Sequence, residues 1–335
     1  MPSTRDPSSD SAETDRAPTP ERRGAAHRYL GWGIALAGIG CCVILVASAP
    51  ADLLEAFRRI RFLPAILAIL FMVATRVVDA WLFVHLFTDE DRGLGFRHAI
   101  RIVTLQNLSA FAAPKSGLVA AAALLKFEHG IGLARFTGVQ IASLTIKIVI
   151  TASIGLCAAI AVRIGMAGDT STGMQDTMIV GFASLLPLVG AGYLVASRAR
   201  ISGSGRIAIA LADGWTGMTD LLKERRRLLW ILTLSTITAL LKIASFCLVV
   251  YGVLGTLDAP LGVVVVSTAS ELGTALSFTP AGLGVREATA GVTAGFADLA
   301  PPLMIGIALV DRMLMLLATL VLAPTILMTR FSPSA

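Results

Sequence analysis

The chain has 335 residues, of which 55% are hydrophobic and 15% are charged, and its mean hydropathy is +0.78. Soluble domains carry about 25% charged residues, so this composition excludes an ordinary water-soluble protein. The formal net charge of +6 comes from basic residues in short loops between apolar segments. That placement is typical of the positive-inside pattern of membrane proteins and does not indicate binding to nucleic acid.

The N-terminal part of the chain predicts a polar tail followed by membrane segments. Residues 1–28 are rich in Ser, Pro, Asp, Glu and Arg and show no apolar periodicity, so we expect a disordered cytoplasmic tail. Residues 30–49 are apolar over too great a length for a cleaved signal peptide, and they predict a first transmembrane helix that begins inside. Residues 51–61 predict a short interfacial helix, and residues 62–87 predict the second span.

Two further apolar stretches are interrupted by proline and glycine. Residues 102–125 contain Pro114-Lys115-Ser-Gly117, and residues 261–300 contain Pro280-Ala-Gly282-Leu-Gly284. We interpret both as re-entrant hairpins, because broken helices at membrane depth are a recurring feature of transporters. A basic loop is expected at 198–227, and full spans are expected at 136–162, 177–197, 228–253 and 301–329.

The basic residues inside the apolar segments recur at matching distances from the two prolines. One basic residue precedes each proline, at the same sequence distance in both halves. Another follows each proline, and these two distances differ by a single residue. Both halves therefore have the same order: a span with a basic residue, a broken hairpin, and another span with a basic residue. The residues concerned are Arg76 and Lys147 around Pro114, and Lys242 and Arg312 around Pro280.

The order of the segments predicts an all-α polytopic membrane protein. It has about six full transmembrane helices and two re-entrant hairpins, eight apolar segments in total, arranged as an inverted repeat. The membrane domain is expected over 29–331, with repeat halves at about 30–163 and 177–330. Counting crossings from a cytoplasmic N-terminus places most Lys and Arg residues of the loops inside, which is the orientation that the positive-inside rule favours.

Ionisable side chains at membrane depth are costly, at about 2.5–3.5 kcal/mol each on insertion scales, so they should be paired or should line a cavity. Arg76 and Asp79 are three residues apart and therefore share a helix face. Lys242 and Glu271 are the other residues that we expect in intramembrane ion pairs. For Arg76 and Asp79, a purely structural role in helix packing is nearly as well supported as a functional one.

The break in the second hairpin predicts a binding site for an anion. A broken helix exposes N–H groups and the positive end of a helix dipole, and Gly282 and Gly284 allow a ligand to approach the backbone. Arg286 adds a guanidinium suited to phosphate, and Glu287 could orient Arg286 or neutralise it. The full set of candidate binding residues is Pro280, Gly282, Gly284, Arg286, Glu287, Asp311, Arg312, Lys147, Pro114, Lys115 and Gly117.

Other kinds of chemistry find little support in the sequence. The four histidines are scattered, and the four cysteines lie in apolar segments without ligand spacing, so we expect no metal, no cofactor and small buried cysteines. The pair Gly282 and Gly284 lacks the third glycine and the preceding strand of a dinucleotide-binding motif. No nucleophile and base occur in a catalytic context, so we do not expect an enzyme.

The segment Thr279-Pro-Ala-Gly-Leu-Gly-Val-Arg-Glu287 resembles the Pro-Gly-Gly-Leu-Gly-Val-Arg-Glu signature of the flippase-like family. This family is also named for the transmembrane region of lysylphosphatidylglycerol synthase, the multiple peptide resistance factor. The resemblance extends over about residues 30–330 and includes Leu124-Leu125-Lys126 and Arg312. Two departures are an alanine at position 281 and Gly117-Leu118 in place of the Gly-Glu usual in the first hairpin.

The resemblance implies translocation of an anionic phospholipid or a glycolipid between the leaflets of the bacterial plasma membrane. The chain reaches Ala335 without an aminoacyl-transferase domain, so we expect no synthase activity. An alternative is a non-transporting scaffold for a membrane enzyme, such as a glycosyltransferase, with the basic loop at 198–227 as its working surface. An enzyme of lipid-linked sugar synthesis is a third possibility, although it lacks the expected carboxylate and metal-binding motifs.

Overall fold

The fold was analysed in a computed structural model, and the residues that it describes are helical apart from short turns. They comprise residues 58, 60–87, 94–112, 115–165, 176–187, 224–276, 282 and 284–328, and no strand occurs among them. Several predicted features lie outside the described residues: the tail at 1–28, the span at 30–49, most of 51–61, the loop at 198–223, Pro114 and Pro280.

The first half of the described chain forms four helices. These are α3 (Phe62–Phe87), α4 (Phe96–Ala112), α5 (Ser116–His129) and α6 (Leu133–Gly165). The pair α4–α5 begins earlier and ends later than the hairpin predicted at 102–125. The reason is that the charged residues Arg101 and Glu128, which mark a loop in the sequence, pair with each other at 3.0 Å across the two helices.

The second half repeats this order. It contains α9 (Arg225–Leu254), α10 (Pro260–Leu276), α11 (Val285–Thr293), the 3₁₀-helix η2 (Ala294–Ala297), α12 (Pro301–Leu322) and the short α13 (Pro324–Met328). The helix Asp176–Pro187 precedes it and covers part of the predicted span 177–197.

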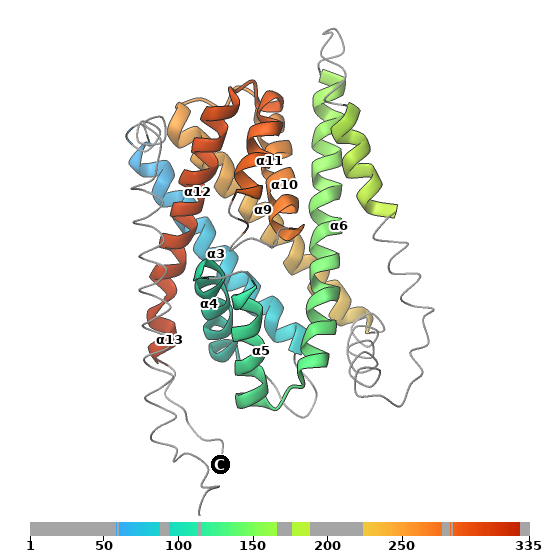
Figure 1. The fold of residues 1–335 in the computed structure, drawn as a ribbon, viewed down its shortest axis with the longest axis vertical. Helices are drawn as coiled ribbons and strands as arrows, with labels where there is room; N and C mark the ends of the chain where they lie inside the picture. The colour runs from blue at the N-terminus through green and yellow to red at the C-terminus, as the bar shows by residue number, and fades with distance from the viewer. Residues whose placement is uncertain are drawn as a thin grey trace, which may run out of the picture.

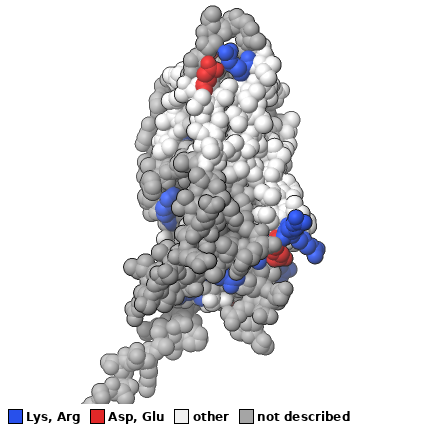
Figure 2. Space-filling view, turned by 90° about the vertical axis from the view of Figure 1, so that its right-hand side faces the viewer, with Lys and Arg blue, Asp and Glu red and all other residues white. Residues whose placement is uncertain are grey.

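Among the described residues, four helices are long and apolar enough to cross a membrane: Phe62–Phe87, Leu133–Gly165, Arg225–Leu254 and Pro301–Ile326. The α6 helix, on the right-hand side in Figure 1, exposes large apolar side chains, including Ile141, Ile160 and Ile164. Figure 2 shows this side of the molecule: its described surface is largely uncharged, with charged side chains near the top and in the lower half. Cys157 is also exposed on α6, so the prediction that it is buried is wrong.

The two broken segments lie in opposite halves of the molecule. Figure 1 shows α4 and α5 in the lower half and α10 and α11 in the upper half, whereas α6 runs through both. The four helices have 17, 14, 17 and 9 residues, respectively. At about 1.5 Å per residue, each is shorter than the ~30 Å hydrocarbon core of a bilayer.

The helix contacts recur when each helix is replaced by its counterpart in the other half: α3 by α9, α4 by α10, α5 by α11 and α6 by α12. The helices α3 and α9 pack directly on each other. The α10 helix packs on α6 while α4 packs on α12, and α3 contacts α12 while α9 contacts α6. The α4–α5 pair likewise corresponds to the α10–α11 pair.

The described residues form two large apolar cores and a small third cluster, and charged residues lie between the two large cores. On α3, Met72 belongs to the upper core and Ala80 to the lower one, with Arg76 between them. On α9, Phe246 and Ile231 belong to the upper and lower core, with Lys242 between them. The charged residues therefore occupy the middle of the helix bundle rather than its ends.

Candidate functional site

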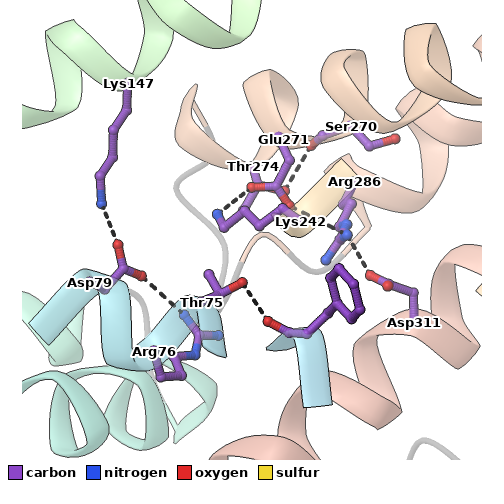
Figure 3. A network of polar contacts seen from close by, with 11 residues as sticks. Thr75, Arg76, Asp79, Lys147, Lys242, Ser270, Glu271, Thr274, Arg286 and Asp311 are labelled. Atoms are coloured by element: carbon purple, nitrogen blue, oxygen red, sulfur yellow. Dashed lines mark hydrogen bonds and ion pairs between the residues drawn. The ribbon is translucent and has the colours of Figure 1, made fainter. Parts of the chain in front are cut away.

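The middle of the bundle contains a network of ionisable side chains that come from six helices (Figure 3). Five of these side chains are cationic and four are anionic, so the described network carries a formal charge of +1. The cations are Arg76, Lys147, Lys242, Arg286 and Arg312, and the anions are Asp79, Glu271, Glu287 and Asp311.

Asp79 connects α3 to α6. Its carboxylate lies 2.9 Å from the Nζ of Lys147 and 3.8 Å from the guanidinium of Arg76. The sequence predicted the contact with Arg76 from the spacing of the two residues on one helix. The shorter contact, with Lys147, joins residues far apart in the sequence and is visible only in the folded chain.

Glu271 connects α9 and α11 through α10. One carboxylate oxygen accepts a hydrogen bond from the Nζ of Lys242 at 2.6 Å, and the other lies 3.4 Å from the guanidinium of Arg286. The Lys242 side chain is 35% exposed, whereas that of Arg286 is 6% exposed. Glu271 is therefore shared between one accessible cation and one buried cation.

Each of two adjacent charged residues of α11 pairs with a residue of opposite charge on α12. Arg286 donates a hydrogen bond to Asp311 at 2.5 Å, and Arg312 lies 3.1 Å from the carboxylate of Glu287. Glu287 thus makes its direct ion pair with Arg312, and the direct carboxylate partners of Arg286 are Asp311 and Glu271. Successive residues of a helix point about 100° apart, so neighbours diverge and each finds its partner on the facing helix.

The N-terminus of α11 already holds an anionic group from the chain itself. The backbone N–H of Gly284 donates to the other oxygen of Glu287 at 2.7 Å. Gly284 and Gly282 both have positive φ angles, 82° and 74°, which glycine adopts without strain. The glycines therefore shape the turn into α11, and the carboxylate of Glu287 takes the place that the sequence suggested for an external anion.

The first broken segment is built by a close approach of its two helices. Gly117 is buried, and a Cβ atom at this position would collide with the backbone carbonyl oxygen of Gln106. Ser116 donates a hydrogen bond to the carbonyl of Ser109, which ties the start of α5 to α4. Lys115 is exposed, has a positive φ of 57°, and lines neither of the two cavities described next.

The accessible part of the network lies in a cavity of about 200 Å³ between α6, α9 and α10. Its ionisable lining residues are Lys147, Lys242 and Glu271. A water molecule needs only about 10–15 Å³ of such volume, so the cavity has room for a polar group of several atoms. The two lysines come from different halves of the chain and are the most exposed cations of the network.

A second cavity, of about 20 Å³, adjoins the larger one. It is bordered by Arg76, Arg286 and Asp311, and it shares Lys242 and Glu271 with the larger cavity. The Lys242–Glu271 pair therefore lines both cavities and lies between the larger and the smaller one.

Sequence reasoning overlooked two polar residues that line the larger cavity, Ser235 and Thr238 on α9. A signal for them was present, because they precede Lys242 by seven and four residues and so share its helix face. Among the described residues, no group of His, Cys, Asp and Glu side chains has an arrangement that could hold a metal ion.

The fold and the buried charges define a helical, multi-pass membrane protein with a cationic cavity at its centre. Residues 31–323 match the family model described as lysylphosphatidylglycerol synthase TM region, and the chain belongs to this family. The resemblance found in the motif that ends at Glu287 is thereby confirmed. No curated protein matches the sequence.

Proposed function

We propose that this protein moves an anionic or glycosylated (phospho)lipid head group across the bacterial plasma membrane, with its N-terminus in the cytoplasm. The observation that carries the proposal is the cavity lined by Lys147 and Lys242 between the two apolar cores. A cationic cavity surrounded by apolar helices can lower the cost of moving a charged head group through the hydrocarbon region.

The proposed architecture is an inverted repeat in which α4–α5 and α10–α11 are re-entrant hairpins that enter from opposite sides. The exchanged helix contacts of the two halves support this relationship, as do the opposite positions of the two pairs in Figure 1. In such repeats the substrate site lies near the bilayer midplane, at the interface of the halves. The two lysines of the cavity come from such corresponding halves, α6 and α9.

The ion pairs suggest how a head group would be accepted. A phosphate that enters the cavity competes with Asp79 for Lys147 and with Glu271 for Lys242. Each carboxylate keeps a second cation when its lysine is taken: Asp79 has Arg76 at 3.8 Å, and Glu271 has Arg286 at 3.4 Å. The head group can thus bind without leaving an acidic side chain unpaired, which would be costly at this depth.

In this mechanism the buried residues Arg286, Asp311, Glu287 and Arg312 hold α11 against α12, and the lysines contact the head group. Separation of Lys242 from Glu271 would also connect the two cavities, because this pair lies between them. The mechanism requires no bond to be made or broken, and we propose no enzymatic activity for the membrane domain.

The proposal is tested by leaflet exchange of a labelled anionic phospholipid in proteoliposomes. Lys147→Gln, Lys242→Gln and the double variant remove the cavity charges, and the double variant should reduce exchange by at least tenfold if each lysine contributes about 1 kcal/mol or more. The matched control is Lys126→Gln, which neutralises an exposed lysine on α5 outside both cavities.

Folding of each variant is checked by gel filtration and thermal unfolding in detergent. Because each acidic partner retains an arginine, we expect the single lysine variants to fold. Exchange by the double variant at the rate of the wild-type protein would rule out the cavity as the path. The absence of exchange by the wild-type protein, relative to empty liposomes, would rule out the proposed function.

A further inference from the structure

Arg76 is the least completely paired cation of the described network. The residue is 6% exposed, and among the described residues its ion pair is with Asp79 alone, at 3.8 Å. The Asp79 carboxylate already accepts a hydrogen bond from the Nζ of Lys147 at 2.9 Å, so its single charge is shared between two cations. A buried charge is ordinarily paired closely and hydrogen-bonded, and Arg76 therefore calls for a further anionic partner.

The charge balance of the network indicates the same deficit. The described network has five cations and four anions. The apolar segments outside the described residues, at 30–49, 188–197 and 277–281, contain no aspartate or glutamate. These segments therefore cannot supply the missing negative charge, and a ligand is left as its source.

The smaller cavity, of about 20 Å³, is the place where such a ligand would meet Arg76. Its ionisable lining residues are the cations Arg76, Lys242 and Arg286 and the anions Glu271 and Asp311, so its lining is positive by one formal charge. Four of these residues form a continuous chain of ion pairs, from Lys242 to Glu271, Arg286 and Asp311 (Figure 3). The excess positive charge at the smaller cavity therefore belongs to Arg76.

The volume of the smaller cavity limits the ligand to a very small one. A water molecule needs about 10–15 Å³ of such volume, so about 20 Å³ accommodates one group of similar size and excludes a phosphate, a sulfate or a carboxylate. The hydroxyl groups of the lining residues Thr75 and Ser245 already donate to the backbone carbonyls of Phe71 and Ala68. A water molecule would fit, but it carries no charge and does not compensate Arg76.

We propose that the smaller cavity binds a monatomic monovalent anion, such as chloride, against the guanidinium of Arg76. The bound anion makes the network of five cations and four carboxylates neutral. Glu271 and Asp311 also border the cavity, and each is held by its own cation, at 2.6 Å from Lys242 and at 2.5 Å from Arg286. This site is separate from the path proposed for a lipid head group in the larger cavity, and it does not depend on transport.

The first test is thermal unfolding of the full-length protein in detergent. Sodium gluconate is replaced stepwise by sodium chloride or sodium bromide, so that the sodium concentration and the ionic strength stay constant. We expect both halides to raise the melting temperature by about 2–4 °C and the rise to saturate, because an anion that binds only the folded state stabilises it. Gluconate is too large for the cavity. Equal melting temperatures in the three salts, or a rise that does not saturate, would overturn the site.

The variant Arg76→Gln removes the charge that holds the anion. Asp79 keeps Lys147 at 2.9 Å in this variant, so no carboxylate loses its closest partner and we expect the protein to fold. Its melting temperature should be the same in chloride, bromide and gluconate. Lys126→Gln is the control, because it neutralises an exposed lysine outside both cavities and should keep the full halide effect. A halide effect of wild-type size in Arg76→Gln would exclude Arg76 as the binding group.

A direct measurement locates the anion without any variant. Crystals of the full-length protein grown in sodium bromide should show an anomalous scattering peak of bromine between Arg76 and Arg286. Equilibrium dialysis against radiolabelled chloride should show a bound chloride that gluconate does not displace. Bromide peaks that all lie elsewhere, or dialysis without bound chloride, would overturn the proposal. Neither result depends on leaflet exchange, so the anion site and the proposed transport function can each fail alone.

Discussion

The guanidinium of Arg286 lies 2.5 Å from the carboxylate of Asp311, on the facing helix, and not beside the carboxylate of its sequence neighbour Glu287. Both members of the pair are almost completely buried, with side chains that are 6% and 3% exposed. The second pair, Arg312 with Glu287, is also buried and joins the same two helices. In this pair α12 supplies the cation and α11 the anion. These two pairs hold α11 on α12, and their burial sets the cost of changing any one member.

Removal of Arg286 alone should destabilise the protein severely. Arg286→Met leaves the Asp311 carboxylate buried without its 2.5 Å partner, and the loss of one member of a buried pair typically costs about 3–5 kcal/mol. Arg286→Met/Asp311→Leu removes both charges and should lose less than the single change. The measurement is reversible unfolding in detergent. A double variant whose loss equals the sum of the two single losses would contradict the pairing.

The two roles of Glu287 can be separated by a pair of substitutions. Glu287→Gln removes the charge that faces Arg312 but keeps an oxygen that can accept from the N–H of Gly284. Glu287→Ala removes both and should be less stable than Glu287→Gln by about 0.5–2 kcal/mol, the usual contribution of an N-terminal cap. Amide hydrogen exchange at Gly284 should accelerate only in the alanine variant. Equal exchange in both variants would exclude a capping role.

The contact between α4 and α5 depends on the absence of a side chain at Gly117. Gly117→Ala places a Cβ atom on the carbonyl oxygen of Gln106, and because this is backbone, the helices must separate. We expect a loss of about 1–3 kcal/mol or more, seen as a lower melting temperature in detergent. Gly132→Ala is the control, because a Cβ atom there meets nothing within 4 Å. Similar melting temperatures for the two variants would refute the close approach.

His129, the last residue of α5, lies outside the four spans and should make stability depend on pH. Burial, and then the nearby His98, lower the pKa of His129 below its usual value, while Glu128 acts in the opposite direction. The unfolded state therefore binds more protons, and stability should fall as the pH drops below about 6.5, the ordinary histidine value.

The charged groups around His129 are few. His98 of α4 contacts its ring edge-on at a centroid distance of 5.5 Å, and Arg101 of α4 pairs with the adjacent Glu128. Thermal unfolding between pH 7.5 and about 5 should show a smaller loss for His129→Gln than for the wild-type protein. An identical pH profile for both proteins would exclude His129 as the titrating group.

The helices that cross the molecule could be predicted from the sequence to within a few residues. The prediction of 62–87 matches α3, and that of 228–253 lies within α9, because long uninterrupted apolar runs have few alternatives to a helix in a membrane. The charged ends of α4 and α5 were assigned to loops instead. Arg101 and Glu128 look like loop residues until their ion pair across the hairpin is seen.

The candidate site was predicted in composition but not in arrangement. The basic and acidic residues of the apolar segments do meet in one network, because a charge at membrane depth needs a partner. Sequence spacing can predict partners on one helix, such as Arg76 and Asp79. It cannot predict partners on different helices, and for this reason the ion pair of Glu287 with Arg312 was not foreseen.

The sequence by itself determined that this chain is a helical membrane protein, which family it belongs to, and that ionisable residues interrupt its apolar segments; hydrophobicity and a local motif suffice for these properties. Only the tertiary structure decided which charged side chains are buried and which are accessible. It places Arg286 and Arg312 in buried pairs and leaves Lys147, Lys242, Ser235 and Thr238 around the cavity. The reason is that access depends on which helix faces meet, and helices distant in sequence supply those faces.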